Sequence, residues 1–131
     1  MSAEYPNDLR YTKEHEWCRL DGNRATIGIT RFAVDSLGDL TQIDLPKEGE
    51  SVRKDAVFGT IESVKAVSDL FAPVSGKVVE VNAPLDASPE TVNEDCYDEG
   101  WMIVVEMSTP SEIDDLMTAA QYEQYLKEQA A

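Results

Sequence analysis

The sequence predicts a single, mainly β domain with one short internal helix and a helical C-terminus. Strand-like runs separated by turn residues recur over about 11–107, and two strand-turn-strand halves meet at a hairpin that carries a lysine. The segment over about 111–128 has helical periodicity instead. A chain of 131 residues can bury one modest core, so we expect one domain over 1–131 with its β core over about 11–107.

The composition is strongly acidic. There are 26 acidic and 11 basic side chains, which give a formal net charge of -15. This charge argues against nucleic acid and anionic membrane surfaces as partners and favours basic proteins. No stretch approaches the ~18 apolar residues of a membrane span, and the N-terminus has no apolar signal core. We therefore expect a cytoplasmic protein, or a mitochondrial matrix protein if the chain is a processed eukaryotic one.

Cysteine and histidine are too few for a metal site built from them. Cys18 and Cys96 are far apart and outside any Cys-x-x-Cys spacing, which argues against a metal or redox motif. Whether the two cysteines pair stays open. His15 stands between two glutamates but has no nucleophile nearby, so we interpret it as a surface or packing residue.

The first third of the chain predicts a hairpin, a helix and a strand. Residues 11–20 alternate like an edge strand, and a turn returns the chain into a second strand over 25–30. Thr30 can cap a short helix that runs through Leu37 and stops at Gly38. Strand signals resume over 40–45.

The middle of the chain predicts the lysine hairpin. Residues 57–61 form one strand-like run, and residues 70–76 lead into a second run over 77–81, with Lys65 in the connection. We interpret 73–76 as a turn that needs the backbone freedom of Gly76.

The last third predicts a loop, a strand and two short helices. Residues 85–100 are rich in polar and turn residues and indicate a long loop, and 101–107 form a buried strand. Pro110 and Ser111 open a helix with Asp114 in the capping-box position, and Thr118 with Gln121 offers a second start. An apolar stripe indicates core packing, and three side chains dock the last helix. The stripe is Ile113, Leu116, Met117 and Ala120, and the docking residues are Tyr122, Tyr125 and Leu126.

Lys65 lies between Val64 and Ala66, with no counter-ion directly beside its amine and room for a modifying enzyme. Acylation would remove the charge of the amine and lengthen the side chain. The motif Glu-Ser-Val-Lys-Ala, then Ser-Asp and Ala-Pro-Val-Ser-Gly, runs from Glu62 to Gly76. This segment closely resembles the lipoylation hairpin of the glycine cleavage H-protein family. Biotin carriers have methionines beside the lysine, and lipoyl domains of 2-oxo acid dehydrogenases have Asp-Lys-Ala; neither pattern is present.

Further matches and two departures accompany this segment. Residues 11–17, 25–30 and 37–40 resemble the family, as does the sequence Gly-Trp-Met at 100–102 preceded by Val-Asn at 92–93. Asp55 stands where the family usually has glycine, although aspartate tolerates left-handed backbone geometry better than most residues. Cys96 stands where proline is usual, which bears on the stiffness of the loop.

The resemblance implies the barrel-sandwich hybrid fold of lipoyl and biotinyl domains and lipoate bound to Lys65 as an amide. The combined arm would reach on the order of 14 Å from the Cα. It would carry the aminomethyl group of glycine from the pyridoxal-phosphate glycine decarboxylase to the tetrahydrofolate-dependent aminomethyltransferase. Dihydrolipoamide dehydrogenase would then reoxidise it, and lipoate attachment enzymes would install it. The protein would be a non-catalytic carrier, and we expect a monomer.

The family also holds the loaded arm in a cleft, where acidic groups engage the amine. Glu16 and Asp69 match those positions, and Glu14 is a possible third. A protonated amine seeks carboxylates, and burial of the contact would limit hydrolytic loss. Glu16 and Asp69 favour glycine cleavage over a related role, an H-like relay that transfers lipoate between enzymes.

Two alternatives come from other classes. A free-standing enzyme lacks support, because the sequence has no Ser/His/Asp set, Gly-rich phosphate loop or metal cluster. An unmodified β-sheet interaction module would show no lipoyl mass increment after exposure to lipoate and ligase.

Overall fold

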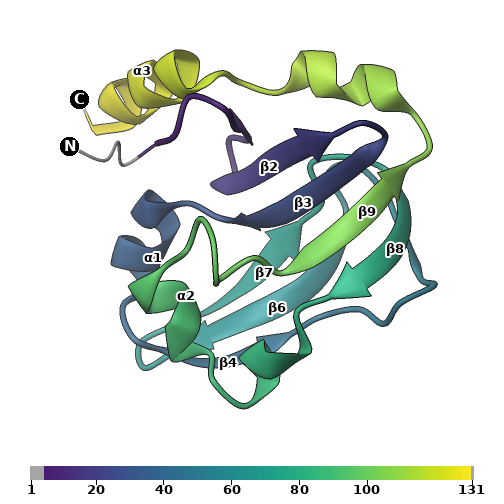
Figure 1. Cartoon of the computed structure of the whole chain (residues 1–131). Helices are drawn as coiled ribbons and strands as arrows, with labels where there is room; N and C mark the ends of the chain where they lie inside the picture. The colour runs from purple at the N-terminus through teal and green to yellow at the C-terminus, as the bar shows by residue number, and fades with distance from the viewer. Residues whose placement is uncertain (1–4, 131) are drawn as a thin grey trace.

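Two antiparallel sheets face one another in the computed structural model, which describes residues 5–130 (Figure 1). The domain was predicted to span residues 1–131, and its first four residues and its last residue lie outside the described range. One sheet has six strands in the order β1-β2-β3-β9-β8-β5, and the other has three in the order β4-β6-β7. The strands of the larger sheet are β1 (Arg10–Tyr11), β2 (Glu16–Asp21), β3 (Arg24–Ile29), β9 (Ile103–Met107), β8 (Gly76–Val81) and β5 (Ser51–Val52). The smaller sheet comprises β4 (Leu40–Asp44), β6 (Val57–Ser63) and β7 (Val67–Phe71). The mainly β, barrel-sandwich prediction is confirmed.

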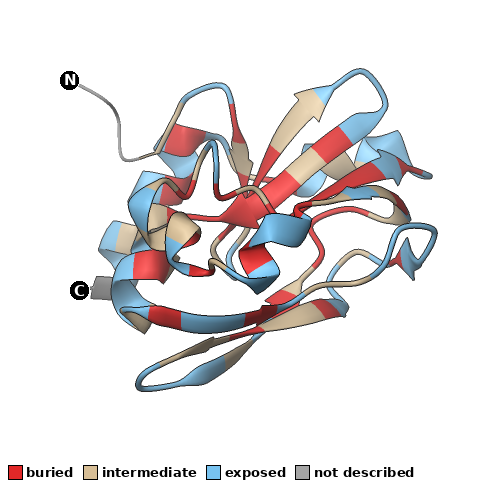
Figure 2. Cartoon of the chain, turned by 60° about the horizontal axis from the view of Figure 1, so that its bottom comes forward, coloured by how far each residue is buried: buried red, intermediate tan, exposed pale blue. Residues whose placement is uncertain are grey.

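The main hydrophobic core fills the space between the sheets, and buried residues run through the interior in Figure 2. Ile27, Ile61, Leu70 and Ile103 are each at most 2% exposed there. A second cluster packs beneath the C-terminal helix α3 (Ala119–Ala130) and includes Tyr122. The two clusters together hold both sheets and the C-terminal segment in one body.

The internal helix α1 (Arg31–Leu37) forms as predicted. The Thr30 side chain accepts a hydrogen bond from the Ala33 amide, which satisfies one donor of the first turn. The helix ends at Gly38, which has a φ of 81° and whose amide donates to the Val34 carbonyl. Local side-chain and glycine signals therefore fix both ends of this helix.

The N-terminal strand predicted over 11–20 is broken in two. The Thr12 amide donates to the Glu16 carbonyl and the His15 amide to the Thr12 carbonyl, which closes a tight turn between β1 and β2. His15 takes a φ of 71° in this turn. Alternating side chains predicted one strand, but such alternation does not reveal a left-handed residue between two pairing segments.

The return strand of the lysine hairpin was predicted wrongly. It is β7, which begins two residues after Lys65 and pairs with β6, whereas residues 76–81 form β8 and pair with β9 and β5. Ser68 and Asp69 fell within the predicted connection, yet they lie on an edge strand of the smaller sheet. One face of an edge strand can carry polar side chains without cost.

The interpretation of Gly76 as a turn glycine is also wrong. Gly76 is the first residue of β8 and lies opposite Met107 of β9. A Cβ at this position would overlap the carbonyl oxygen of Glu106 and approach Val105 Cγ1 at 2.7 Å. Close approach of the neighbouring strand therefore requires glycine here.

The polar segment predicted as a loop contains two short helices, a 3₁₀ helix η1 (Ala83–Asp86) and α2 (Glu90–Glu94). Each contributes a buried anchor, Leu85 and Val92. Helices of four or five residues are too short to show helical periodicity in sequence. The buried strand predicted from 101 begins at Ile103, and Asp55 takes a φ of 69°, the left-handed geometry expected for it.

The C-terminal segment divides into a 3₁₀ helix, η2 (Pro110–Asp115), and α3. The capping box predicted at Ser111 and Asp114 is wrong, because Thr109 caps η2 without a side-chain hydrogen bond. The predicted second start is confirmed: the Thr118 amide donates to Gln121 and the Gln121 amide to Thr118. The buried alanine is Ala119 rather than Ala120. Tyr122, Tyr125 and Leu126 dock α3 as predicted.

Cys18 and Cys96 are both buried and free, so the open question of a disulfide is answered in the negative. Over residues 5–130, no helix is long and apolar enough to cross a membrane.

Candidate functional site

Lys65 stands in the turn between β6 and β7, where the sequence predicted it. The Ser63 amide donates to the Ala66 carbonyl at 2.8 Å, and the Ser63 hydroxyl oxygen accepts from the amides of Lys65 and Ala66. The hydroxyl thus replaces turn hydrogen bonds that water would otherwise supply. Val64, Lys65 and Ala66 are all exposed, so the turn presents the lysine to solvent.

The Lys65 side chain lies over the end of α1. A Cβ built on Gly38 would lie 3.5 Å from Cε and 4.0 Å from Nζ of Lys65. Within the described part of the chain, the salt bridges do not include Lys65. The amine is therefore accessible and can be acylated without breaking an ion pair.

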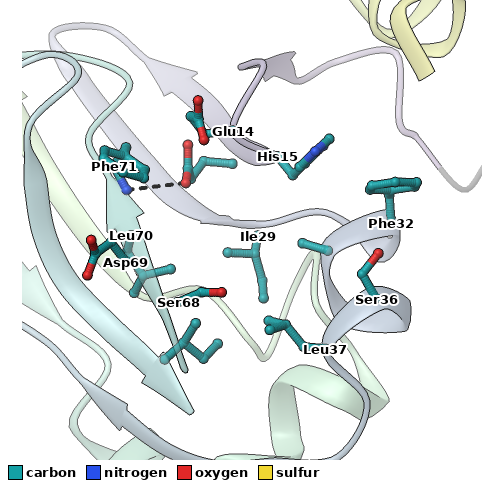
Figure 3. Close-up of a pocket in the computed structure, with 13 residues that line it drawn as sticks. Glu14, His15, Ile29, Phe32, Ser36, Leu37, Ser68, Asp69, Leu70 and Phe71 are labelled. Carbon is teal, nitrogen blue, oxygen red and sulfur yellow. Dashed lines mark hydrogen bonds between the residues drawn. The ribbon is translucent and has the colours of Figure 1, made fainter. Parts of the chain in front are cut away.

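A cleft of about 380 Å³ opens between α1 and β7. Its lining includes Leu37, the neighbour of Gly38, over which the Lys65 side chain lies. Figure 3 shows Phe32, Ser36 and Leu37 of α1 on one side, and Ser68 and Asp69 of β7 on the other. The remaining lining residues are Glu14, His15, Glu16, Ile29, Ala33, Ile61, Leu70 and Phe71. The lining is apolar at the floor and acidic near β2 and β7.

Glu16 is the buried acid of the cleft, at 2% exposure. One carboxyl oxygen accepts from the Thr12 hydroxyl at 2.7 Å. The other accepts from the Phe71 amide at 3.2 Å, the dashed line in Figure 3. Burial outweighs these hydrogen bonds and raises the pKa of Glu16 to about 8. At neutral pH the group is mostly a neutral acid, although a cation brought into the cleft would favour its ionised form.

Glu14 and Asp69 are exposed acids at the rim of the same cleft. Across residues 5–130, neither side chain makes a hydrogen bond or salt bridge. The structure therefore brings together the three acids singled out in the sequence, but in two different environments. Glu16 is held and mostly neutral, whereas the two rim carboxylates are solvated and available to a ligand.

His15 lines the cleft and connects it to the C-terminal helix. Its Nδ1 lies 2.7 Å from the Tyr122 hydroxyl, which lies 2.8 Å from the hydroxyl of Thr30, the residue that caps α1. Its ring lies 4.6 Å from that of Phe32. Burial lowers the pKa of His15, which favours the neutral imidazole. His15 is thus a half-buried residue that packs against Phe32 and Tyr122, which agrees with the expectation of a surface or packing residue.

Comparison with known proteins then identifies the family. A family model described as "Glycine cleavage H-protein" matches residues 9–129. The chain belongs to the glycine cleavage H-protein family. It is 55% identical over 126 residues to the glycine cleavage system H protein of Anaeromyxobacter sp. (strain K), covering 96% of this chain and 98% of the relative. It is also 55% identical over 123 residues to that of Bacillus subtilis (strain 168), covering 94% and 97%.

A solved structure agrees. The crystal structure of a glycine cleavage system H protein from Mycobacterium marinum matches with a TM-score of 0.86 and 38% identity, covering 93% of this chain and 98% of that one. The resemblance read from the lysine hairpin is thereby confirmed at the level of the family, whose members are carrier components of glycine cleavage.

Sequence reasoning missed one wall of the H-protein cleft. Phe32, Ser36 and Leu37 were predicted as part of a helix but not as lining residues. Nothing local to residues 31–37 indicates that this helix faces β7, because the packing brings together elements that are 30 residues apart. No group of acidic, histidine and cysteine side chains suited to a metal ion occurs among the described residues.

Proposed function

We propose that this protein is the lipoyl carrier of the glycine cleavage system, with lipoate attached as an amide to Nζ of Lys65. The observation that carries the proposal is the presentation of Lys65 in an exposed turn, directly beside a cleft with an acidic rim, in a chain of the H-protein family. Hydrogen bonds to Ser63 hold the backbone of the turn while the lysine side chain is exposed, so an attachment enzyme could reach the amine.

The residues present fit the group. Acylation would remove one positive charge from a side chain that forms no ion pair with any residue of the described range 5–130. The arm would extend on the order of 14 Å from the Cα, which allows it to leave the domain or to fold back over Gly38 toward the cleft. Bound lipoate would supply a dithiolane disulfide, which accepts an electron pair together with a carbon fragment.

The acids of this chain would hold and shield the end of the loaded arm. Asp69 and Glu14 would meet a protonated amine as free carboxylates at the rim. Glu16 lies deeper and would release its proton to solvent when the protonated amine approaches, since a nearby cation lowers the pKa of a buried acid. The apolar side chains Ile29 and Leu70 would exclude water from this contact.

The partners that fit are the enzymes that load, unload and reoxidise the arm. These are the pyridoxal-phosphate glycine decarboxylase, the tetrahydrofolate-dependent aminomethyltransferase and dihydrolipoamide dehydrogenase, together with the enzymes that attach lipoate. A surface with a formal charge of -15 favours steering toward basic patches on such partners.

Intact mass measurement tests the proposal. The full chain, incubated with lipoate, ATP and a lipoate ligase, should gain the mass of one lipoyl group, and the Lys65→Arg variant should gain none. Reconstituted glycine cleavage should require the modified wild-type chain. An unmodified wild-type mass, or normal glycine cleavage with Lys65→Arg, would contradict the proposal.

A further inference from the structure

The lysine turn is joined to the segment between α1 and β4. Leu40 of β4 lies opposite Ser63 of β6, and the Val64 amide donates to the Asp39 carbonyl at 3.1 Å. Val64, the donor of this hydrogen bond, immediately precedes Lys65 in the chain. The conformation of residues 38–40 therefore affects the direction in which the turn projects its lysine.

Asn93 of α2 fixes those three residues from the other side. Its Nδ2 donates to the Gly38 carbonyl at 2.8 Å, and its Oδ1 accepts from the Leu40 amide at 3.0 Å. The two contacts bracket Asp39, the acceptor for the Val64 amide. One side-chain amide thus satisfies the backbone groups on both sides of the residue that anchors the lysine turn.

Asn93 is itself held in place. The Arg31 guanidinium donates to its backbone carbonyl at 3.1 Å, and the neighbouring Val92 is fully buried. Leu40 is buried in the core, but the two residues before it have less support, because Gly38 has a φ of 81° and ends a helix, and Asp39 is exposed. The Lys65 side chain lies over this same Gly38. Without Asn93, the backbone link through Gly38 would determine where the Asp39 carbonyl lies, and with it the position of the lysine turn.

We propose that Asn93 is a positioning residue for Lys65: its bridge across Asp39 holds the lysine turn in the conformation that the lipoate attachment enzyme recognises. This proposal rests on the proposed function, since it names a determinant of the same modification. Among the described residues, the hydrogen bonds of the Asn93 side chain go to Gly38 and Leu40 and not to Lys65. It acts through Asp39 and Val64.

Loss of the Asn93 bridge is expected to change KM for the carrier rather than kcat. An enzyme that binds one conformation of the turn sees an apparent affinity reduced by the fraction of molecules in that conformation. Acylation of a correctly bound lysine would be unchanged. Loss of the bridge should therefore raise KM for the carrier and leave kcat as it was.

Asn82 supplies a matched control in the same half of the chain. Its Nδ2 donates to two backbone carbonyls, those of Glu99 at 3.0 Å and Trp101 at 2.7 Å. Its alanine variant also removes two side-chain hydrogen bonds to the backbone, but these lie at the entry to β9 rather than beside the lysine turn. A general loss of stability would affect both variants alike.

The experiment compares the wild-type chain with Asn93→Ala and Asn82→Ala as substrates of a lipoate ligase. Asn93→Ala should raise KM about fivefold with unchanged kcat, and hydrogen exchange of the Val64 amide should accelerate about tenfold. Asn82→Ala should change neither. If Asn93→Ala does not fold, Asn93→Asp keeps the acceptor for Leu40 and loses the donor to Gly38, and it should give a smaller shift in the same direction.

An unchanged KM and unchanged Val64 exchange in the Asn93 variant would overturn the inference, as would equal shifts in both alanine variants. Failure of the proposed function is distinguishable, because the wild-type chain would then gain no lipoyl group at all. Val64 exchange would still report on the bridge in that case.

Discussion

The lysine turn and the buried acid Glu16 of the cleft lie at opposite ends of β7 and are built in opposite ways. Residues 64–66 are exposed, and the Lys65 amine makes no salt bridge in the described part of the chain. Glu16 is 2% exposed, with both carboxyl oxygens hydrogen-bonded and its pKa raised to about 8. The turn leaves its chemical group free, whereas the cleft changes the chemistry of its group by desolvation.

The two regions differ in how much their functional groups contribute to the stability of the fold. A group that must leave the domain on an arm cannot contribute to the core, so its replacement should leave folding unchanged. A group that is buried in a cleft is part of the packed structure, so its charge state and the stability of the domain are linked. Variants in the two regions should therefore differ in kind as well as in size.

The largest expected contrast is between the packed sheet and the turn. Gly76→Val should destabilise the domain by about 5 kcal/mol or more, because its side chain would enter the space of the Glu106 carbonyl and Val105. Lys65→Ala should change the free energy of unfolding by less than about 0.5 kcal/mol. Denaturant unfolding of both variants measures this contrast.

Where Gly76→Val yields no folded protein, Gly76→Ala is the informative variant, since its single Cβ meets the same carbonyl. A Lys65→Ala variant as unstable as Gly76→Ala would show that the lysine has a structural role and would remove the contrast.

The next effect is a pH dependence that belongs to Glu16. Its pKa is about 8 when folded against 4.5 for the free group, so between these values the folded state retains a proton that the unfolded chain releases. The contribution of Glu16 to stability is fully present below pH 4.5 and is lost as the pH rises toward 8. The Glu16→Gln side chain resembles the neutral acid and does not ionise, so the stability of this variant should not fall with pH in this way.

The variant should therefore gain stability relative to wild type, by on the order of 3 kcal/mol, as the pH rises from 5 to 8. Unfolding free energies of both proteins at matched pH values provide the test. A constant difference across this range would mean that Glu16 ionises like a solvated acid, and the contrast with the turn would fail.

The smallest effect concerns the loaded arm. Asp69→Asn and Glu16→Gln should each shorten the lifetime of the loaded form about threefold to tenfold, because the protonated amine loses a charged partner. The lipoylated but unloaded form should be unaffected. The lifetime is measured with the partner enzymes removed, and Asp39→Asn serves as control, since Asp39 is exposed near the lysine but does not line the cleft. Decay at the wild-type rate in both cleft variants would leave these acids without a role in holding the arm.

The sequence by itself determined the features that depend on neighbouring residues. The cap of α1 at Thr30 and its end at Gly38 involve side chains and backbone within a few positions, and so does the Thr118–Gln121 capping box. The motif around Lys65 sufficed to indicate the family and the exposed turn. The acids Glu14, Glu16 and Asp69 could be named in advance, but only from the resemblance.

The tertiary structure alone decided everything that depends on distant segments. The return strand of the hairpin is β7 rather than residues 77–81, because β8 pairs with β9, and Gly76 is required by the Glu106 carbonyl across that pairing. Asn93 meets Gly38 and Leu40 over more than 50 residues of sequence. The Glu16 pKa rises because β7 and the turn after β1 remove its carboxyl from water. The close approach of strands at Gly76 and the desolvation of Glu16 depend on which segments pack together. A local pattern of residues cannot predict them.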